Sequence, residues 1–597
     1  MATTGEKNTL PLDKRCAPVR VELEELTKAA LAAAFPDATD APLVAPCNNL
    51  KNGDYQINNA MGLFGRMKGK EGAPKNPRAV AEAIIANLPA TDVVTEKPTI
   101  AGPGFINLKL SGGWMAARIS AMLKDGIGTW APPVAPKSVV VDFSSPNVAK
   151  EMHVGHLRST IIGDTLCRLL AFCGHDVTRL NHIGDWGTQF GMLIQHMADT
   201  NPRGLEGAGE EGVSDLMKLY RDAKKRFDED EEFKTRARNA VTDLQSGRPE
   251  YLAAWTKICE ASRVEFQAIY ERLGVVIDER GESFYNPMLK PLVERLSEEG
   301  VAEESDGCKC IFVEGYDVPL IIQKSDGGFG YASTDLAAVE HRVKEMKSDW
   351  VIYVTDAGQS QHFAMVFAGA RKAGILPPAG AEGPRVDHVP FGLVLGEDGK
   401  RFRTRSGDVV RLVELLDEAY DRIKGTIKER RPDIPEDELD FAAKAMGYGA
   451  VKYADLKNSR TTNYKFSYDA MLDLKGNTAV YLLYAHARIA SIGRKSGRNI
   501  DELVQTAELK LEHPNELALA MHILKFPEAV EAAVEELGPN RLTDFLYDLS
   551  VRFNEFYQEC QVLGSDSEDS RLLLCEATAV CMRACFGLLG ITPLMRI

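Results

Sequence analysis

The spacing of apolar side chains near the amino terminus predicts a small unit of helices and strands. Residues 19–35 repeat apolar side chains at helical spacing and predict an amphipathic helix. The segments 54–67 and 102–111 alternate apolar and polar residues and contain glycines, so we expect strands and turns there. The proline-rich stretch 129–137 predicts a linker. We therefore expect residues 1–132 to form a separate α+β domain.

A strand–helix–strand unit is predicted directly after this linker. Residues 138–145 are a short apolar run rich in β-branched residues, as expected of a buried parallel strand. Residues 157–174 carry apolar side chains at helical spacing, with Gly174 as a candidate helix C-cap, and residues 175–185 predict a second strand. Such a unit predicts an α/β fold with a doubly wound parallel sheet, in which ligands bind at the carboxyl ends of the strands.

The rest of the chain predicts two further regions. Residues 200–300 are charged and helical in period, and we interpret them as an insertion that does no chemistry. Residues 301–395 return to short apolar strands that alternate with helices, whereas residues 410–597 are helical in period almost throughout. We therefore expect an α/β domain over residues 133–409, with its insertion, and an α-helical domain over residues 410–597.

Composition excludes several classes of protein. The 597 residues are 44% hydrophobic and 26% charged, which is ordinary globular usage and argues against disorder or a fibrous protein. No apolar run reaches 18 residues and the first residues lack the apolar core of a secretion signal, so we expect no membrane contact. The 11 cysteines are odd in number and form no CxxC pair, which indicates free thiols and a cytoplasmic protein.

The net charge of −15 means that any nucleic-acid contact must be local. One such place is the segment 66–78, which holds five basic residues and one acidic residue. Its lysines Lys68, Lys70 and Lys75 are candidate phosphate contacts. On charge alone, a solubilising surface loop is an equally good interpretation of this segment.

Two motifs carry candidate phosphate chemistry. His153, Gly155 and His156 follow the first parallel strand and open the next helix, where unpaired N–H groups and the helix dipole favour phosphate. Lys150 lies just upstream and adds charge. A pair of incidental loop histidines is the alternative, and a zinc site is less favoured because neither an HExxH pattern nor cysteine ligands accompany them.

The second motif is a basic loop between glycines, over residues 396–407. Lys400, Arg401, Arg403 and Arg405 lie within six positions, after a segment that reads as a strand. Such a loop supplies charge to a leaving pyrophosphate. Taken alone, a basic surface hairpin is the better interpretation.

Together the two motifs resemble the paired signatures of class I aminoacyl-tRNA synthetases, and the chain most closely resembles the arginyl-tRNA synthetase family. The resemblance extends over residues 1–597 and is carried, in order, by the segments 144–164, 182–191, 331–338, 358–363, 476–489 and 588–597. One position departs from the class pattern, because residues 403–407 lack the second lysine of the usual basic loop. The resemblance implies that Lys150 supplies this missing charge.

The resemblance also implies the reaction, the fold and the partners. It implies a Rossmann-like catalytic domain that activates L-arginine with ATP and Mg²⁺ and transfers it to the terminal adenosine of arginine tRNA, with tRNA needed for the first step. No protein-ligated metal is expected, and we expect a monomer. The implied catalytic residues are Lys150, His153, His156, Arg403 and Arg405; the implied ATP contacts are Lys150, His153, Gly155, His156, Phe391 and Gly392.

The arginine site and the tRNA contacts follow from the same resemblance. The implied arginine contacts are Asp142, Ser144, Ser145, Asn147, His156, Tyr331, Asp335 and Gln359. The implied tRNA contacts in the helical domain are Tyr481, Arg488 and Tyr557, with the lysines of segment 66–78 at the tRNA elbow. Core packing is the alternative for Tyr481, because its surroundings are apolar.

Residue spacing agrees with a pocket for a guanidinium group. Tyr331 and Asp335 are four positions apart and share one face of a helix, while Asp142 ends the first parallel strand. Carboxylates of Asp335 and Asp142 would bind a guanidinium by paired hydrogen bonds, with Tyr331 stacked on its plane. A surface role for Asp335 is the alternative. A small nucleotidyltransferase and an inactive tRNA-binding homologue are the rival functions; the first would lack the helical domain, and the second would have lost Lys150, His156 or Asp335.

Overall fold

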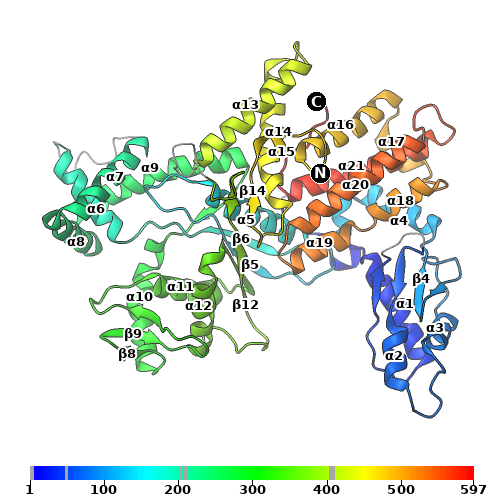
Figure 1. The fold of residues 1–597 in the computed structure, drawn as a ribbon, viewed down its shortest axis with the longest axis horizontal. Coiled ribbons are helices and arrows are strands. Elements are labelled where there is room, and N and C mark those ends of the chain that lie inside the picture. Colours follow the sequence, from blue (N-terminus) through cyan, green and yellow to red (C-terminus); the bar gives the residue numbers. More distant parts are fainter. Residues whose placement is uncertain (1–5, 48–51, 202–204, 206–212, 403–409) are drawn as a thin grey trace.

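The computed structural model describes residues 6–47, 52–201, 205, 213–402 and 410–597. The amino-terminal part folds as a four-stranded antiparallel sheet, in the order β1-β2-β4-β3, with helices packed on it (Figure 1). Its elements are η1 (Leu12–Lys14), α1 (Val19–Ala34), β1 (Val44–Pro46), β2 (Tyr55–Ile57), α2 (Asn59–Met67), α3 (Pro77–Ala86), β3 (Thr99–Ala101), β4 (Phe105–Leu108), α4 (Gly112–Asp125) and η2 (Ile127–Trp130).

The strand prediction for residues 54–67 is only half right. Residues 55–57 form β2, but residues 59–67 form α2. Ala60 and Leu63 are buried three positions apart, which is the spacing of one helix face and not of a strand. The alternation in the sequence therefore belongs to two short elements of different kinds.

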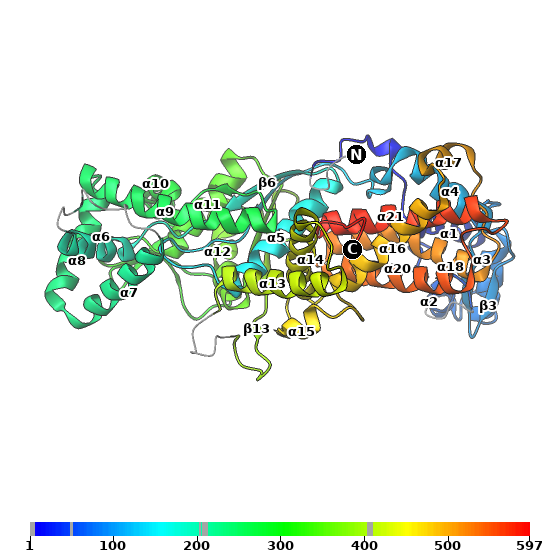
Figure 2. The same cartoon turned by 90° about the horizontal axis from the view of Figure 1, so that it is seen from above.

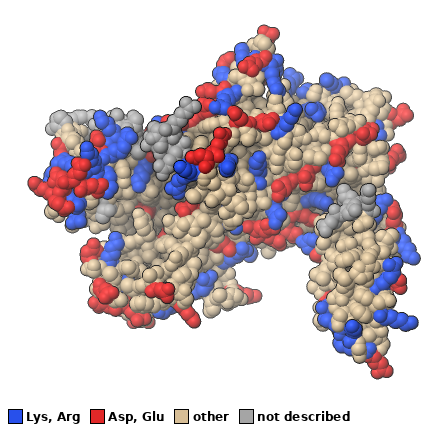
Figure 3. Space-filling model, viewed as in Figure 1, with Lys and Arg blue, Asp and Glu red and all other residues tan. Residues whose placement is uncertain are grey.

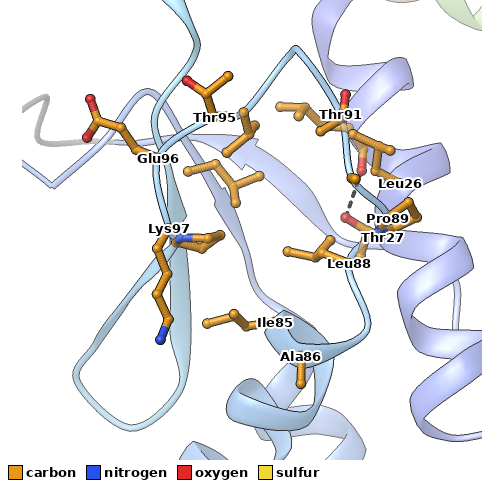
Figure 4. Close-up of a pocket in the computed structure, with 15 residues that line it drawn as sticks. Leu26, Thr27, Ile85, Ala86, Leu88, Pro89, Thr91, Thr95, Glu96 and Lys97 are labelled. Atoms are coloured by element: carbon orange, nitrogen blue, oxygen red, sulfur yellow. Dashed lines mark hydrogen bonds between the residues drawn. The ribbon is translucent and has the colours of Figure 1, made fainter.

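An apolar cleft of about 570 Å³ opens on this amino-terminal part, between α1, α3 and residues 88–98. Figure 4 shows Leu26, Ile85 and Leu88 lining it, with Glu96 and Lys97 on the neighbouring loop. All of its lining residues come from this part of the chain, so the cleft is separate from the parallel sheet described next.

The predicted parallel sheet is present, with five strands in the order β12-β11-β5-β6-β7, all parallel. The strands are β5 (Ser138–Asp142), β6 (Asp176–Asn181), β7 (Asp278–Glu279), β11 (Trp350–Asp356) and β12 (Arg385–Phe391). Helix α5 (Val154–Phe172) connects β5 to β6 as expected, and Gly174 follows its C-cap with φ +90°, which glycine adopts without strain. Asp142 and Tyr353 are paired across β5 and β11, so the carboxyl ends of the central strands meet at one edge.

Further elements surround this sheet on both sides. The helices are α6 (Thr188–Thr200), α7 (Val213–Glu229), α8 (Glu231–Gln245), α9 (Pro249–Leu273), α10 (Glu282–Glu298), α11 (Tyr331–Glu340) with a π-helical turn η4 (His341–Glu345), η5 (Ala357–Gln359) and α12 (Ser360–Lys372). A separate antiparallel sheet contains β8 (Glu303–Ser305), β9 (Cys308–Ile311) and β10 (Leu320–Gln323). A short parallel pair joins β13 (Val394–Leu395) to β14 (Tyr464–Lys465).

The carboxyl-terminal part is helical, as its periodicity predicts. Its helices are α13 (Leu412–Arg430), α14 (Glu436–Leu456), α15 (Tyr468–Met471), α16 (Ala479–Ser496), α17 (Ile500–Thr506), α18 (Pro514–Ile523), α19 (Phe526–Glu535), α20 (Asn540–Glu559) and α21 (Glu568–Leu588). Figure 2 shows an elongated molecule: the parallel sheet and α6–α9 lie in one half, α16–α21 lie beside the amino-terminal part in the other half, and α13–α15 lie between them. In the described part of the chain, no helix is long and apolar enough to cross a membrane.

Helix α5 joins these two halves. The guanidinium of Arg158 on α5 lies 2.9 Å from the Asp455 carboxylate on α14, and both side chains are only 1% exposed. Arg158 also donates a hydrogen bond of 2.7 Å to the carbonyl of Gly392, after β12. On the sheet side of α5, Gly163 lies against the Phe143 ring so closely that a Cβ atom there would overlap the ring.

Glycine-to-alanine substitutions at two helical positions should therefore shift stability in opposite directions. Gly163→Ala forces the Phe143 ring or α5 to move, and overpacking of this kind costs about 1–3 kcal/mol. Gly65→Ala on α2 meets no atom within 4 Å and gains about 0.5–1 kcal/mol of helix propensity. Thermal unfolding followed by circular dichroism should show a lower midpoint for the first variant and an equal or higher midpoint for the second. A midpoint unchanged by Gly163→Ala would mean that the close approach is not a constraint.

Candidate active site

The loop from β5 to α5 is held in a strained conformation. Ser144, Ser145 and Ala149 have φ angles of 72°, 49° and 60°, in the left-handed region that side chains other than glycine disfavour. Such residues cost of the order of 1–3 kcal/mol each and persist only where their surroundings hold them. The loop lies at the carboxyl ends of the strands, where the α/β fold predicts a ligand site.

Hydrogen bonds from three other elements hold this loop. The backbone N–H of Ser144 donates to Ser159 Oγ on α5 (2.8 Å), and that of Ser145 donates to Asn181 Oδ1 at the end of β6 (2.9 Å). The N–H of Ala149 donates to Ser262 Oγ on α9 (3.0 Å). The loop conformation is therefore imposed by tertiary contacts.

Helix α9 takes part in the site, although the sequence gives the insertion no role in chemistry. Besides Ser262, it contributes Tyr270, whose hydroxyl lies 2.7 Å from Ser144 Oγ and accepts a hydrogen bond of 2.9 Å from Asn181 Nδ2. Burial raises the pKa of Tyr270 to about 12, so the hydroxyl keeps its proton and can donate to Ser144. These two side chains of the insertion therefore hold the loop in place, which corrects the expectation that the insertion has no part in the site.

The two histidines of the first motif begin α5 as predicted. His153 is the N-cap residue, and its Nδ1 accepts a hydrogen bond from the Gly155 N–H (3.0 Å). The Nδ1 atom of His156 accepts a hydrogen bond from the His153 N–H (3.0 Å), and the two rings lie 3.9 Å apart. A neutral imidazole that accepts through Nδ1 carries its proton on Nε2. Each ring therefore has one Nε2–H group to donate.

Both imidazoles are neutral near pH 7. Burial, followed by His153 and Lys150, lowers the pKa of His156 to about 3. Burial and then Arg401 lower the pKa of His153 as well. These histidines can therefore donate hydrogen bonds to phosphate oxygens but bring no positive charge. In the described part of the chain, no group of three or more His, Cys, Asp or Glu side chains is arranged to hold a metal ion.

Positive charge reaches the histidines from the basic loop, so the two motifs meet in space. Arg401 influences the pKa of His153, and the segment beyond the loop returns to the same place, where Arg411 forms an antiparallel bridge with His153. The loop begins as a tight turn, in which the Gly396 N–H donates to the Lys400 carbonyl at 2.8 Å. Arg403 and Arg405 lie outside the described residues.

Lys150 extends from the strained loop toward the insertion. Its Nζ atom lies 5.5 Å from the centre of the Tyr220 ring on α7, a cation–π contact. Of the two further residues expected to contact ATP, Phe391 is the last residue of β12 and Gly392 follows it. The Phe391 side chain is buried with Arg158 5.7 Å from its ring centre. A Cβ atom at Gly392 would be 2.7 Å from Asn463 Oδ1, so close packing requires glycine there.

The residues expected to bind arginine lie near the same strand ends, where an α/β sheet predicts a crevice for a ligand. Tyr331 is the first residue of α11 and is 74% exposed, whereas Asp335 lies one turn deeper with its side chain 16% exposed. The Asp335 carboxylate is 2.6 Å from His362 Nε2 on α12. Gln359 is exposed in η5, directly after β11. The expected shared face of Tyr331 and Asp335 is confirmed.

Asn147 is placed by a glycine from the next loop. Asn147 and Gly184 form a parallel bridge, and a Cβ atom at Gly184 would overlap Asn147 Oδ1. Any larger residue at position 184 would displace the amide. This close approach gives a physical reason for the glycine in the segment 182–191 that resembles the family.

Asp142 has a partner that was not predicted from the sequence. The Asp142 carboxylate is buried, and its Oδ2 lies 2.7 Å from the guanidinium of Arg342 in η4, while Oδ1 accepts a hydrogen bond from Ser145 Oγ (3.2 Å). Asp142 therefore already has an internal guanidinium partner, and its binding of a substrate guanidinium together with Asp335 stays a prediction. Arg342 lies seven positions after Asp335, which is nearly two helical turns, so its place on the face of Tyr331 and Asp335 was detectable in the sequence.

A second missed residue is Glu282, at the start of α10. Burial, followed by the neighbouring carboxylates Asp185 and Asp335, raises the pKa of Glu282 to about 8. Glu282 also affects the pKa of Tyr331, which places it beside the other crevice residues. No pattern in the sequence around Glu282 indicates a site. Glu282 reaches its place because the connection from β7 to α10 brings it there. A buried carboxyl group with a raised pKa in a crevice is a candidate ligand for a cation.

The residues expected to bind tRNA in the helical part surround a small cleft. Tyr481 and Arg488 line a cleft of about 230 Å³ together with Arg430, Tyr484 and Asn554. Asn554 donates to the Tyr481 hydroxyl (2.6 Å) and accepts from Arg488 (3.2 Å). Tyr481 is half-buried, so its ring forms a wall of this cleft as well as packing on the core.

Tyr557 and the expected elbow lysines lie elsewhere on the surface. Tyr557 is 41% exposed on α20, with its ring stacked on Phe553. Lys68, Lys70 and Lys75 are exposed on the connection between α2 and α3, and among the described residues none of the three has an ion-pair partner. Figure 3 shows basic side chains at this free end of the amino-terminal part.

Three family models match the chain in succession. Residues 21–110 match the arginyl tRNA synthetase N-terminal domain, residues 119–468 match the catalytic domain of class I (R) tRNA synthetases, and residues 482–597 match the DALR anticodon-binding domain. These matches confirm the fold class predicted from the sequence, namely an α/β catalytic domain between an α+β part and a helical part.

Similar proteins and solved structures agree with these matches. The chain is 57% identical to the chloroplastic/mitochondrial arginine–tRNA ligase of Arabidopsis thaliana, covering 96% of this chain and 90% of that protein. It is 56% identical to the cytoplasmic ligase of the same plant, covering 97% and 98%. The arginyl-tRNA synthetase structure from Plasmodium falciparum superposes with a TM-score of 0.86 at 35% identity, covering 98% of this chain and 100% of that one. The arginyl-tRNA synthetase structure from Thermus thermophilus superposes with a TM-score of 0.77 at 26% identity, covering 97% of this chain and 100% of that one.

Proposed function

The chain belongs to the arginyl-tRNA synthetases and is an arginine–tRNA ligase, and from that premise we propose which of its residues carry out each step. The reaction is ATP + L-arginine + tRNA → arginyl-tRNA + AMP + pyrophosphate. The observation that supports the assignment best is the meeting of His153 and His156 with the basic loop at the carboxyl ends of β5 and β12. Histidine donors and cationic side chains there can surround a triphosphate.

In the first step, a carboxylate oxygen of arginine attacks the α-phosphorus of ATP. A new P–O bond forms, the bond to the β-phosphate oxygen breaks, and pyrophosphate leaves with the electron pair. The Nε2–H groups of His153 and His156 donate to oxygens on which charge develops. ATP brings Mg²⁺ on its phosphates, and the backbone at Gly155 allows the nucleotide a close approach.

Cationic side chains supply the charge that the neutral histidines lack. Lys150 approaches from the strained loop, and Arg401 approaches from the basic loop, which continues to Arg403 and Arg405. In the second step, the 2′-hydroxyl of the terminal adenosine of the tRNA attacks the arginyl carbonyl carbon. The bond from that carbon to the phosphate oxygen breaks, and AMP leaves.

The guanidinium of the substrate lies between Asp335 and Glu282, beneath the exposed ring of Tyr331. Two carboxylates on one side and an aromatic face on the other match a planar cation with five N–H donors. The α-amino and carboxylate groups of the substrate arginine are held at the carboxyl end of β5. The residues that hold them are Asp142, Ser144, Ser145, Asn147 and Gln359. Lysine cannot make the paired hydrogen bonds that a guanidinium makes. A site built for such bonds discriminates against an analogue that lacks them by a factor of about 10⁴–10⁵ in one step, so no editing domain is needed.

The tRNA contacts three regions of the chain. The cleft of Tyr481, Tyr484 and Arg488 takes an anticodon base that has left its stack, since aromatic and guanidinium planes suit that purpose. Tyr557 contacts the neighbouring part of the anticodon stem-loop, and the lysines of segment 66–78 contact phosphates at the elbow. The terminal adenosine enters the crevice between these regions.

We place this enzyme in the cytoplasm and describe it as a monomer. All 11 cysteines are free in the structure, as expected of a protein kept in a reducing compartment. One chain supplies all three proposed tRNA contacts, so the reaction needs no second copy.

Arginine-dependent exchange of pyrophosphate into ATP, with and without tRNA, tests the function directly. A small nucleotidyltransferase would show no arginine dependence, and an inactive homologue would show no exchange.

Lys150→Ala should reduce the rate of activation far more than it weakens arginine binding. Lys150 acts on charge that develops on the phosphates, so its removal affects kcat, by roughly 10²–10³-fold. The KM for arginine should stay within about threefold, and Lys150→Arg should recover much of the rate because it keeps the charge. Steady-state exchange kinetics for both substrates provide the measurement. An unchanged kcat in Lys150→Ala would remove this lysine from the phosphate site.

Arginine binding should release a proton from Glu282. In the free enzyme the pKa of Glu282 is about 8, so at pH 7.5 the group holds about three-quarters of a proton. The bound guanidinium favours the ionised form, so affinity should rise with pH up to about 8 and then level off. Calorimetric titration in two buffers of different ionisation enthalpy measures the proton release.

Two variants make that measurement specific. Glu282→Gln should weaken arginine binding and abolish both the proton release and the pH dependence. Glu528→Gln is the matched control, because burial also raises the pKa of Glu528, but its partner is Tyr55 in the amino-terminal part. Proton release that persists in Glu282→Gln would assign it to another group.

Charge reversal in segment 66–78 should weaken tRNA binding and reduce its salt dependence. When Lys68, Lys70 and Lys75 are changed to glutamate, the slope of log affinity against log salt should fall by about 0.7–0.9 for each lysine that binds a phosphate. Reversal of Lys290, Lys344 and Lys347, on α10 and after α11, is a control of equal charge. Binding measured by fluorescence anisotropy at several salt concentrations gives the slope. Equal slopes for the two triple variants would mean that the segment 66–78 does not bind tRNA and only keeps the protein in solution.

A further inference from the structure

Arg342 is a buried guanidinium at the base of the crevice for the substrate guanidinium. It is fully buried, and Asp142 is its only ion-pair partner among the described residues. The rings of Tyr353 and Tyr285 lie 4.9 Å and 5.9 Å from it. Its Nε and Nη1 atoms, and the hydroxyl of Tyr353, have no hydrogen-bond partner in the described part of the chain. An arginine packed with so little hydrogen bonding depends on Asp142 for its counter-charge.

The fold brings Arg342 to Asp142 by two separate devices. Tyr331, Asp335 and Arg342 lie on one face of α11 and its continuation η4, from the mouth of the crevice to its base. The π-helical turn η4 contains Arg342, and such turns often occur at functional sites. From the sheet, the paired positions Asp142 and Tyr353 direct their side chains to the face that α10, α11 and α12 cover (Figure 1).

The pairing leaves Asp142 with a limited capacity. Oδ2 is occupied by Arg342, and Oδ1 accepts from Ser145 Oγ but has a second lone pair to offer. A substrate guanidinium that binds a carboxylate as a fork needs both oxygens. Asp142 can therefore accept one N–H of an ammonium group. Asp335, whose Oδ2 already lies 2.6 Å from His362 Nε2, and Glu282 share the N–H donors of the substrate guanidinium between them.

We propose that Arg342 is a positioning residue of this ligase, which orients the Asp142 carboxylate so that Oδ1 receives the α-ammonium group of L-arginine. Without Arg342, the carboxylate at the strand end lacks its counter-charge and is free to turn. The substrate ammonium then loses its partner, while the guanidinium contacts at Asp335 and Glu282 remain. The inference rests on the proposed arginine crevice.

A substrate analogue without the α-amino group separates this role from a general loss of structure. The analogue is 5-guanidinopentanoate, which keeps the guanidinium and the carboxylate of arginine, and its inhibition constant is measured in the aminoacylation assay. In Arg342→Met, the KM for arginine should rise about 30- to 100-fold, with the KM for ATP and the inhibition constant of the analogue within twofold of the wild type. Asp142→Asn should give the same pattern. Because both variants interrupt one contact, the double variant should be no worse than either single one.

Further variants make every outcome decisive. Asp335→Asn should weaken arginine and the analogue alike; if it changes neither, the crevice itself is misassigned. Arg571→Met breaks the Arg571–Glu516 pair in the helical part and should leave all three constants unchanged. Arg342→Lys keeps the charge and should raise the KM for arginine less than tenfold, which provides the test should Arg342→Met fail to fold. Loss of analogue binding in either Arg342 variant, or multiplied effects in the double variant, would overturn the inference.

Discussion

The buried contacts of helix α5 are the constraint on which the rest of the structure depends. This helix begins at His153 and His156, and about one turn later it is joined to α14 of the helical part by Arg158 and Asp455. Taking both charges out of water is unfavourable unless they remain together, so the two elements cannot separate without a large loss of stability. Helix α14, which lies within the residues that match the catalytic-domain model, and the two histidines are therefore attached to one rigid element.

A second set of charges extends this junction toward the carboxyl terminus. Asp164 on α5 lies 2.7 Å from Arg168 and 2.5 Å from Arg179, and Lys452 on α14 donates to the carbonyls of Leu273 and Gly590. Burial lowers the pKa of Lys452 to about 8, in spite of the nearby Asp164. Lys452 on α14 thus joins the end of α9 to Gly590, near the last residues of the chain.

Charge is divided between the two ends of the active site. At the phosphate end the histidines are neutral donors, and lysine and arginine side chains from two loops bring the positive charge. At the arginine end several carboxylates converge, and the chain places one guanidinium of its own, Arg342, among them. One buried carboxylate is thereby compensated before substrate arrives, and Glu282 reduces the repulsion further by holding a proton. The folded chain therefore does not have to hold several ionised carboxylates close together against their mutual repulsion before a cation binds.

The sequence by itself determined the parallel sheet, helix α5 with its histidines and the helical carboxyl-terminal part, because periodicity and helix-start signals depend on residues close together in the chain. It also determined the shared face of Tyr331 and Asp335. It misjudged residues 59–67, where a short strand and a short helix adjoin. Only the tertiary structure decided the left-handed backbone of Ser144, Ser145 and Ala149, the neutral state of His156, the raised pKa of Glu282 and the pairing of Asp142 with Arg342. The raised pKa of Glu282 and the Asp142–Arg342 pair depend on groups that lie dozens to hundreds of residues away, and the neutral state of His156 depends above all on burial in the folded chain. No local pattern in the sequence records such contacts.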